Sequence, residues 1–236
     1  MSSATGKKLA ERLVQKIAPD YRPPSDIYQS QLQELVQNTK IWLDLGCGNA
    51  DFIVDFQHLS FGVGVDLRLP IKPTMGNAPF VLADMYHLPF QAESCDLVAL
   101  RFVVEHLANI ESLFAEMRRV IKTGGQLLIY TTNRASPLVF LPNLLPFQLK
   151  KWLIQKLFGV DIESVFPTFH KFNTPGIIKH APGGFALVKT IYLDGISFDQ
   201  WSLFLPSLVW YMLTRPGFME PGRVNLLAVY QRVADN

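Results

Sequence analysis

The sequence of 236 residues is poor in charge, poor in cysteine and free of long apolar runs. Charged residues make up 18%, against about 25% in an average globular domain, while hydrophobic residues make up 49%. Two cysteines are too few for a disulfide framework or a zinc site, so a reducing cytoplasm is the expected compartment. No apolar run reaches the roughly 18 residues that span a bilayer, and Met1–Lys16 lacks the apolar core of a signal peptide. One large domain, or one domain with a cap, is expected.

Charge and aromatic residues are divided unevenly along the chain. Residues 1–132 carry 12 Lys and Arg against 14 Asp and Glu, a balance of −2, whereas residues 133–236 carry 10 against 6, a balance of +4. The second part also holds 16 aromatic residues against 12 in the longer first part. This composition fits a cap that meets an apolar or anionic partner, and it fits equally a cap helix with solvated lysines.

The stretch Ile41–Ala50 has the pattern of a buried strand that runs into a glycine turn. Gly46 and Gly48 remove side chains where the backbone must turn sharply and lie close to a ligand. Asp66 ends the next strand, 20 positions after Gly46, where a carboxylate can accept hydrogen bonds from both hydroxyls of a ribose. Asp51 stands where a dinucleotide fingerprint has its third glycine. The stretch therefore favours adenosylmethionine over NAD as the ligand.

Strands and helices alternate up to residue 132, which predicts a parallel sheet with right-handed crossovers. Two helices, over 7–18 and from Ser25 or Asp26 onward, precede the first strand. Further strands are expected at 61–66, 79–84, 95–100 and 126–131, and helices at 51–58 and 109–121.

The regular alternation of strands and helices ends after residue 132. We expect a helix over 146–158, a short helix with Pro175 at its first position, and strands at 185–193 and 223–232. An apolar helical stretch over 198–213 is interrupted by Pro206. This stretch and the helix over 146–158 either rest on a membrane surface or pack together as the core of a cap.

Several motifs together resemble the class I S-adenosylmethionine-dependent methyltransferases, in particular the subgroup that contains the ubiquinone and menaquinone methyltransferases. The resemblance covers about residues 40–132, and a weaker likeness follows in Phe166–Thr168 with Asn173–Thr174. The motifs that carry it are Asp44–Gly48, Gly64–Asp66, Ala83–Met85 with Leu88–Phe90, Asp96–Val98 followed by Glu105–His106, and Leu113–Ile129.

The resemblance implies an α/β fold: a Rossmann-like, doubly wound, seven-stranded sheet with an antiparallel last strand and a helical cap insertion. The expected plan has N-terminal helices in residues 1–39 and a cofactor-binding core in residues 40–132. A cap or substrate region with one sheet strand follows in residues 133–222, and residues 223–236 supply the last strand.

The resemblance also implies S-adenosyl-L-methionine as cofactor and assigns its contacts. The backbone of the glycine loop approaches the methionine part, Asp44 holds its ammonium group, and Asp66 takes the ribose hydroxyls. Asp84 accepts from the adenine amine, and the Met85 amide donates to a ring nitrogen. The remaining cofactor neighbours are expected to be Gly46, Cys47 and Gly48 in the loop, Leu67 after Asp66, and Arg101 beside the methionine part.

Methyl transfer from a sulfonium is an in-line displacement, so the protein mainly positions the acceptor and excludes water. A hydroxyl acceptor also needs a base. His106, just after the fourth strand, is the first candidate and His170 the second, because histidine titrates near neutrality. His106 with Glu105 could equally brace the following helix. Some relatives bind a metal through an acid three positions before the Glu-His pair. This chain has Phe102 at that position, so we expect no metal.

The acceptor is expected to be a small aromatic or lipid-like molecule, methylated at oxygen rather than at carbon or nitrogen. Residues 99–104 lack the run of Asn or Asp, two prolines and an aromatic that serves flipped bases, and the cap has no dense basic stripe. We therefore expect no nucleic-acid partner. The expected location is cytoplasmic, with peripheral membrane contact through the cap left open. The alternative function is a non-catalytic adenosylmethionine-binding partner subunit.

Overall fold

The computed structural model describes residues 3–69, 79–144, 146, 148–149, 168–180, 182–198 and 201–234. One seven-stranded sheet lies at its centre, in the order β3-β2-β1-β4-β5-β7-β6, with β7 antiparallel to both of its neighbours. The predicted fold class is thus confirmed. The strands are β1 Ile41–Leu45, β2 Phe61–Asp66, β3 Phe80–Leu82, β4 Cys95–Arg101, β5 Ile121–Thr132, β6 Phe185–Leu193 and β7 Asn225–Arg232.

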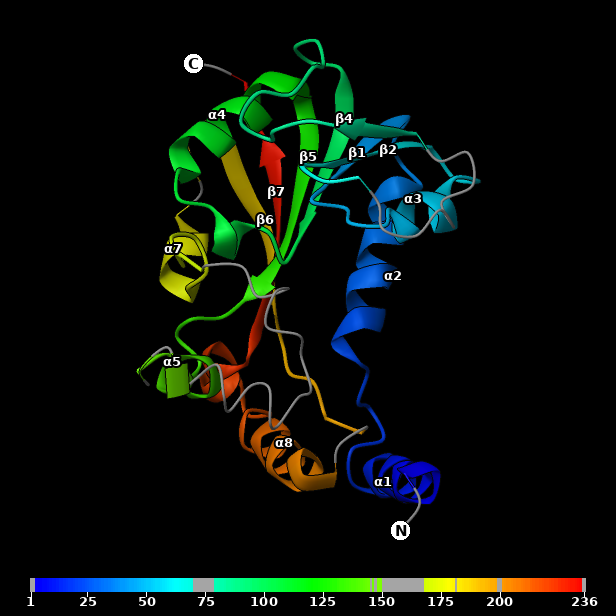
Figure 1. The fold of residues 1–236 in the computed structure, drawn as a ribbon, viewed down its shortest axis with the longest axis vertical. Helices are drawn as coiled ribbons and strands as arrows, with labels where there is room; N and C mark the ends of the chain where they lie inside the picture. Colours follow the sequence, from blue (N-terminus) through cyan, green and yellow to red (C-terminus); the bar gives the residue numbers. More distant parts are fainter. Residues whose placement is uncertain are drawn as a thin grey trace.

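Helices cover both faces of this sheet, α2 and α3 on one and α4 and α7 on the other (Figure 1). Side chains alternate between the faces along each strand, so β4 gives Leu97 and Ala99 to the first face and Val98 and Leu100 to the second. The helices are α1 Ser3–Ile17, α2 Pro24–Val36, α3 Asp51–Phe56, α4 Ile110–Val120, α5 Pro137–Asn143, α7 Pro175–Lys179 and α8 Trp201–Leu213, with short 3-10 turns η2 Val104–His106 and η4 Gly217–Gly222.

Several boundaries differ from the sequence-based prediction for local reasons. The helix α2 begins at Pro24, because a proline at the first position needs no hydrogen-bond partner, and neither Ser25 nor Asp26 caps it. The strand β5 begins at Ile121, directly after α4, because Ile121 pairs with Cys95 across a register shift in β4. Residues 122–125, which lie between the predicted helix at 109–121 and the predicted strand at 126–131, are therefore part of β5.

The apolar stretch near the C-terminus forms one helix, α8, which continues through Pro206 instead of breaking there. The helix α5 was not expected at all. The expected helix over 146–158 lies almost wholly outside the described residues, as do Phe166 and Pro167.

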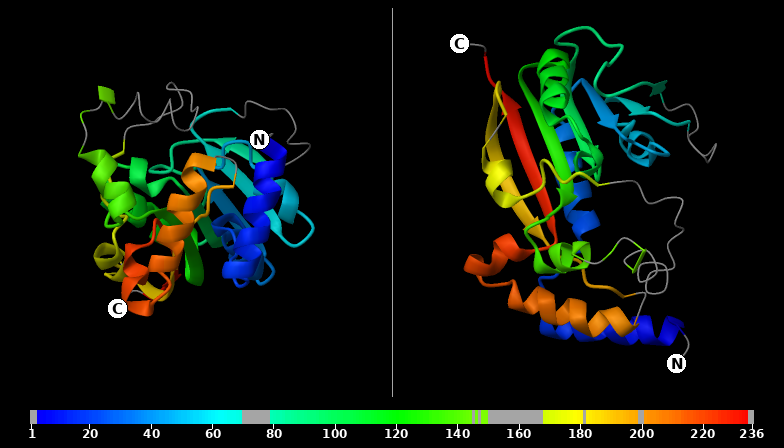
Figure 2. Two further views of the ribbon diagram at one scale, coloured as in Figure 1. Left: turned by 90° about the horizontal axis from the view of Figure 1, so that it is seen from below. Right: turned by 60° about the vertical axis from the view of Figure 1, so that its left-hand side comes forward.

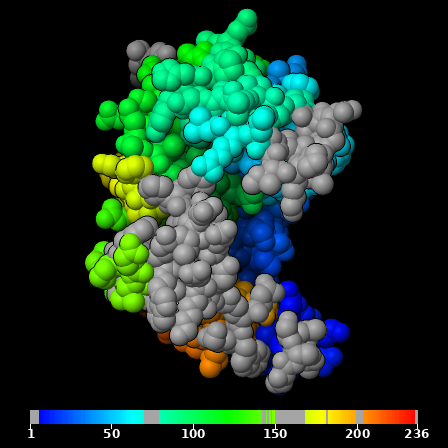
Figure 3. Space-filling view, in the orientation of Figure 1, coloured from blue at the N-terminus to red at the C-terminus, as the bar shows by residue number. Residues whose placement is uncertain are grey.

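The N-terminal helix α1 lies alongside α8 at the end of the molecule away from α4 (Figures 1 and 2). A separate hydrophobic cluster joins them, in which Ala10 and Val14 of α1 contact Phe204 and Leu208 of α8. The helix α2 spans the distance from this pair to the sheet, and its outer side is visible on the flank of the molecule (Figure 3). Within the described ranges no helix is long and apolar enough to cross a membrane.

Candidate cofactor and acceptor site

The glycine loop after β1 is held against the end of β2. The amides of Gly46 and Cys47 both donate to the carbonyl of Val65, at 2.8 and 3.3 Å. Gly46 has a φ of +70°, and a Cβ there would lie 2.4 Å from Cγ2 of Val103. Only glycine fits this position. Gly48, with a φ of +56°, faces open space, so a ligand can approach the backbone there.

Asp66, at the end of β2, is bound directly to this loop. Its Oδ2 accepts from the Gly48 amide at 2.9 Å, and its Oδ1 accepts from the Arg68 amide at 3.1 Å. The carboxylate is only partly buried, so lone pairs remain for a further donor. Leu67, the next residue, is exposed. The structure thus brings Asp66 and Gly48 together.

Asp44 lies inside β1, between Gly64 of β2 and Ala99 of β4. Its side chain is buried, and this burial raises the pKa of the carboxyl to about 7. The Arg101 guanidinium opposes the shift, while the nearby carboxylates of Asp66 and Asp51 add to it. A positively charged partner would stabilise the ionised form of this buried carboxyl group. Arg101 itself is exposed and lies over the Phe52 ring, 4.7 Å from its centroid.

Asp84 follows β3, beyond the strand's end at Leu82. Its Oδ1 accepts from the Tyr86 amide at 2.9 Å, while its side chain stays exposed. Met85 beside it is buried. The amide of Ala83 donates to the carbonyl of Asp66 at 3.1 Å, which ties the ends of β2 and β3 together. The strand order therefore sets Asp84, Asp66 and Asp44 along one edge of the sheet, the carboxyl edge, where open α/β sheets bind ligands.

The two candidate bases reach this edge from different parts of the chain. His106 ends η2, directly after β4. The carbonyl of its neighbour, Glu105, accepts from the amides of Phe169 and His170, at 2.8 and 3.1 Å. The segment that carries His170 is therefore held against the segment that carries His106. His170 itself has a left-handed φ of 52°, which costs energy in a residue other than glycine.

Beyond the possibility that Glu105 braces a helix, the sequence assigned no role to the buried polar groups near these histidines. The Glu105 carboxylate accepts from Oγ1 of Thr131 at 2.8 Å, and burial raises the pKa of Glu105. The fully buried amide of Asn173 lies 2.7 Å from Nδ1 of His170, and its Oδ1 finds no hydrogen-bond partner within the described part of the chain. The motif pairs Glu105–His106 and Asn173–Thr174 were the only signal in the sequence.

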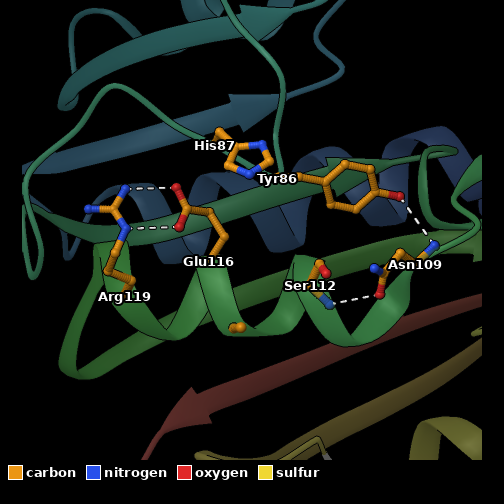
Figure 4. Close-up of a pocket in the computed structure, with 7 residues that line it drawn as sticks. Tyr86, His87, Asn109, Ser112, Glu116 and Arg119 are labelled. Carbon is orange, nitrogen blue, oxygen red and sulfur yellow. Dashed lines mark hydrogen bonds and ion pairs between the residues drawn. The ribbon is translucent and has the colours of Figure 1, made fainter.

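A separate pocket of about 480 Å³ lies between α4 and the segment after β3 (Figure 4). Its polar walls serve the fold. Arg119 pairs with Glu116 at 2.7 Å and donates to the carbonyls of Leu88 and Phe90, and Glu116 accepts from the Leu88 amide. None of the predicted site residues lines this pocket, whose walls are Tyr86, His87, Asn109, Ser112, Ala115, Glu116 and Arg119.

Comparison with known proteins agrees with this geometry. Residues 43–129 match the Methyltransferase domain family. The chain is 32% identical over 132 residues to the demethylmenaquinone methyltransferase of Roseiflexus castenholzii, which covers 52% of this chain and 56% of that protein. It is 34% identical over 109 residues to the ubiquinone/menaquinone biosynthesis C-methyltransferase UbiE of Cupriavidus pinatubonensis, covering 46% and 44%. The chain thus spans about half the length of the curated relatives it matches.

Solved structures share the fold over a longer range. A SAM-dependent methyltransferase from Archaeoglobus fulgidus superposes with a TM-score of 0.57 at 16% identity, covering 93% of this chain and 98% of that one. The PH0226 protein from Pyrococcus horikoshii gives a TM-score of 0.55 at 20% identity, covering 86% and 87%. At these identities the likeness concerns the fold alone. By its glycine loop, its strand-end acids and the match over residues 43–129, this chain carries a class I S-adenosylmethionine-dependent methyltransferase domain, which is distantly similar to the ubiquinone and menaquinone enzymes.

Proposed function

We propose that this chain transfers a methyl group from S-adenosylmethionine to a small hydroxylated aromatic or lipid-like acceptor. The observation that carries the proposal is the carboxyl edge of the sheet, where the Gly48 amide binds Asp66 beside the buried Asp44. The cofactor, when bound, supplies an electrophilic methyl group on a sulfonium. The residues present fit it, because Gly46 and Gly48 leave the loop backbone accessible and the buried Asp44 can pair with a cation. Arg101, whose charge acts on Asp44, is itself exposed to solvent.

In this proposal each acid recognises a different part of the cofactor. Asp44 binds the ammonium group, and Asp66 accepts from the ribose hydroxyls through lone pairs that the amides of Gly48 and Arg68 leave open. Asp84 accepts from the adenine amine, and the Met85 amide donates to the ring. The loop residues Gly46, Cys47 and Gly48 border the methionine part together with Arg101, and Leu67 borders the ribose.

On the acceptor side we propose His170 as the base, with His106 as the alternative. Deprotonation of a phenolic hydroxyl makes both the oxygen and the ring carbons beside it more nucleophilic, so the same base serves either methylation. Sequence analysis predicted oxygen as the methylated atom, whereas the name of the UbiE relative records a C-methyltransferase. A ring with a free hydroxyl and a free neighbouring carbon offers both atoms.

Asn173 supports His170 because its amide can select the imidazole tautomer. If the amide nitrogen of Asn173 faces Nδ1 of His170, Nδ1 must accept the hydrogen bond. The proton of the neutral ring then sits on Nε2, and Nε2 cannot act as a base. If the amide is turned so that its oxygen faces Nδ1, Nδ1 carries the proton and the basic lone pair of the ring lies on Nε2. Turning the amide of Asn173 exchanges the positions of its nitrogen and its oxygen. Oδ1, which has no hydrogen-bond partner within the described residues, can then accept from Nδ1–H of His170.

Calorimetry with adenosylmethionine tests the cofactor half of the proposal, and turnover to adenosylhomocysteine with hydroxylated aromatic acceptors, with and without an apolar tail, tests the acceptor half. Carbon-13 NMR of the product distinguishes a methyl group on oxygen from one on carbon. Absence of cofactor binding would contradict both halves of the proposal. Binding without turnover on any acceptor would instead favour a non-catalytic partner subunit.

Asp66→Ala should weaken cofactor binding about tenfold to a hundredfold, since a hydrogen bond to a charged group contributes about 1.5–3 kcal/mol. The dissociation constant from calorimetry measures this loss. Asp55→Ala, which removes an exposed acid from the neighbouring helix α3, is the matched control and should bind as the unmodified chain does. Equal affinities for the two variants would remove Asp66 from the cofactor site.

A further inference from the structure

The helix α8 presents apolar side chains to solvent along one whole face. Leu205, Val209, Met212 and Leu213 are exposed, Leu205 to 60%, and their spacing of four, three and one places them on the same side of the helix. The adjacent side of the helix carries Phe204 and Leu208, which are buried in the cluster with α1. The helix contains no charged residue, so its outer face has no polar cover of its own.

A further exposed apolar residue follows the helix in the chain. Phe218, in η4 just after α8, is 83% exposed. Single exposed apolar side chains are ordinary, but a contiguous set rimmed by polar residues marks an interaction surface. The exposed residues of α8, at neighbouring positions on one helix face, form such a set.

The helix α1, which packs alongside α8, carries positive charge. It carries four basic residues, Lys7, Lys8, Arg12 and Lys16, against the single acid Glu11, a balance of +3. All five residues are exposed, and none is part of the cluster that joins α1 to α8. The pair of helices is fixed further by an ion pair of 2.9 Å between Arg215, after α8, and Asp20, after α1.

We propose that α1 and α8 form a base that docks on the surface of a bilayer containing anionic lipids. The apolar face of α8 enters the boundary between headgroups and acyl chains, and the basic face of α1 lies on the anionic headgroups. Charge selects this occupant over a second copy of the chain, because a symmetric contact through the base would set one α1 with its +3 balance against another. No spanning helix is needed for such binding.

The orientation places the candidate site toward the bilayer. The parallel strands point their carboxyl ends toward the base, as the arrowhead of β5 shows in Figure 1, so the cofactor edge lies on the side of the sheet that faces α1 and α8. The docking surface goes beyond the proposed function and stands without it, since vesicle binding is measured with neither cofactor nor acceptor.

Flotation of the full chain with vesicles tests the proposal. One set contains phosphatidylcholine with about 30% phosphatidylglycerol, which gives a negative surface. The other set contains phosphatidylcholine alone. We expect binding to the anionic set and at least tenfold weaker binding to the neutral set. Val209→Asp should reduce binding about tenfold or more, and Lys8→Glu with Arg12→Glu should do the same.

Matched controls carry the same change of charge elsewhere. Val188→Asp alters an exposed apolar residue on the edge strand β6, and Lys40→Glu with Lys179→Glu reverses two exposed lysines away from the base. Both should float as the unmodified chain does, and thermal unfolding checks that every variant is folded. The proposal fails if the unmodified chain floats with neither vesicle, or if the controls lose binding as much as the base variants. A dimer in sedimentation that Val209→Asp dissociates, without vesicle binding, would assign the face to a second copy instead.

Discussion

Of the three acids at the carboxyl edge, Asp44 is the one that the fold buries, while Asp66 is partly exposed and Asp84 exposed. Their positions along the chain were predicted from strand ends and spacing, because parallel strands bring successive carboxyl ends to one edge. Their environments were not predictable in this way. The raised pKa of Asp44 depends on the neighbours β2 and β4, which cover it from both sides.

The pKa of Asp44 gives the stability of the free protein a definite pH dependence. The folded-state value of about 7 lies above the ordinary value of 3.8, so between these two values the folded chain keeps a proton that the unfolded chain has lost. The contribution of Asp44 to the free energy of unfolding is therefore most favourable at low pH, and it falls as the pH rises through about 7. Asp44→Asn should be more stable than the unmodified chain at pH 8 and gain less at pH 4, measured by urea unfolding at both values.

The same titration should appear in cofactor binding, because only the ionised Asp44 attracts an ammonium group. Affinity should rise with pH through about 7 in the unmodified chain, and this rise should be missing in Asp44→Asn. The cofactor's own titration is common to both proteins, so the difference between them isolates Asp44. Asp55→Asn serves as control. Parallel pH curves for all three proteins would contradict the assignment.

His170→Ala should lower kcat by about 10²–10⁴, the usual contribution of a general base, and leave cofactor affinity unchanged. His106→Ala, measured beside it, decides between the two candidates, and His58→Ala provides a control at an exposed histidine.

Asn173 acts through His170 as a positioning residue, so its test needs more than a loss of rate. Asn173→Ala should lower kcat, and Asn173→Asp should recover part of it, because a carboxylate oxygen still accepts from Nδ1–H. The carboxylate also favours the imidazolium, so the pH profile of kcat in Asn173→Asp should move to higher pH. Identical profiles in Asn173→Asp and the unmodified chain would leave Asn173 with a structural role only.

Among the secondary-structure elements, α4 follows the sequence most closely, from its cap to its buried stripe of Leu113, Phe114, Met117 and Val120. Its N-cap, Asn109, accepts from the Ser112 amide at 3.0 Å. Asn109→Ala should destabilise the protein by about 1 kcal/mol, while Asn109→Asp, which keeps the acceptor, should lose little. Urea unfolding measures both, and equal losses in the two variants would show that the cap is not responsible.

Other elements depart from local preference because tertiary contacts override it. Pro206 removes one hydrogen bond from α8, yet the helix continues, since Phe204 and Leu208 on either side of it are buried in one cluster with α1. The start of β5 at Ile121 likewise depends on its pairing with Cys95, a residue from another strand.

For the whole molecule, the cluster between α1 and α8 is separate from the two clusters that cover the sheet. Phe204→Ala, at a side chain only 1% exposed, should destabilise this base by about 3–5 kcal/mol. Hydrogen exchange should then accelerate at the amides of α1 far more than at those of β5. Val209→Ala, on the exposed face of the same helix, should change neither, and uniform acceleration in Phe204→Ala would mean that base and sheet unfold as one unit.

The sequence by itself determined the order of strands and helices, the glycine loop and the acids at the strand ends, because these depend on local periodicity and on fixed spacing. Only the tertiary structure decided that α1 joins α8, that the backbone of Glu105 holds His170 beside His106, and that Asn173 lies beneath that histidine. Asn173 lies only three residues from His170, but the other two contacts join segments tens to almost two hundred residues apart. No local pattern encodes such a contact, because it depends on how the packed elements place their side chains in space.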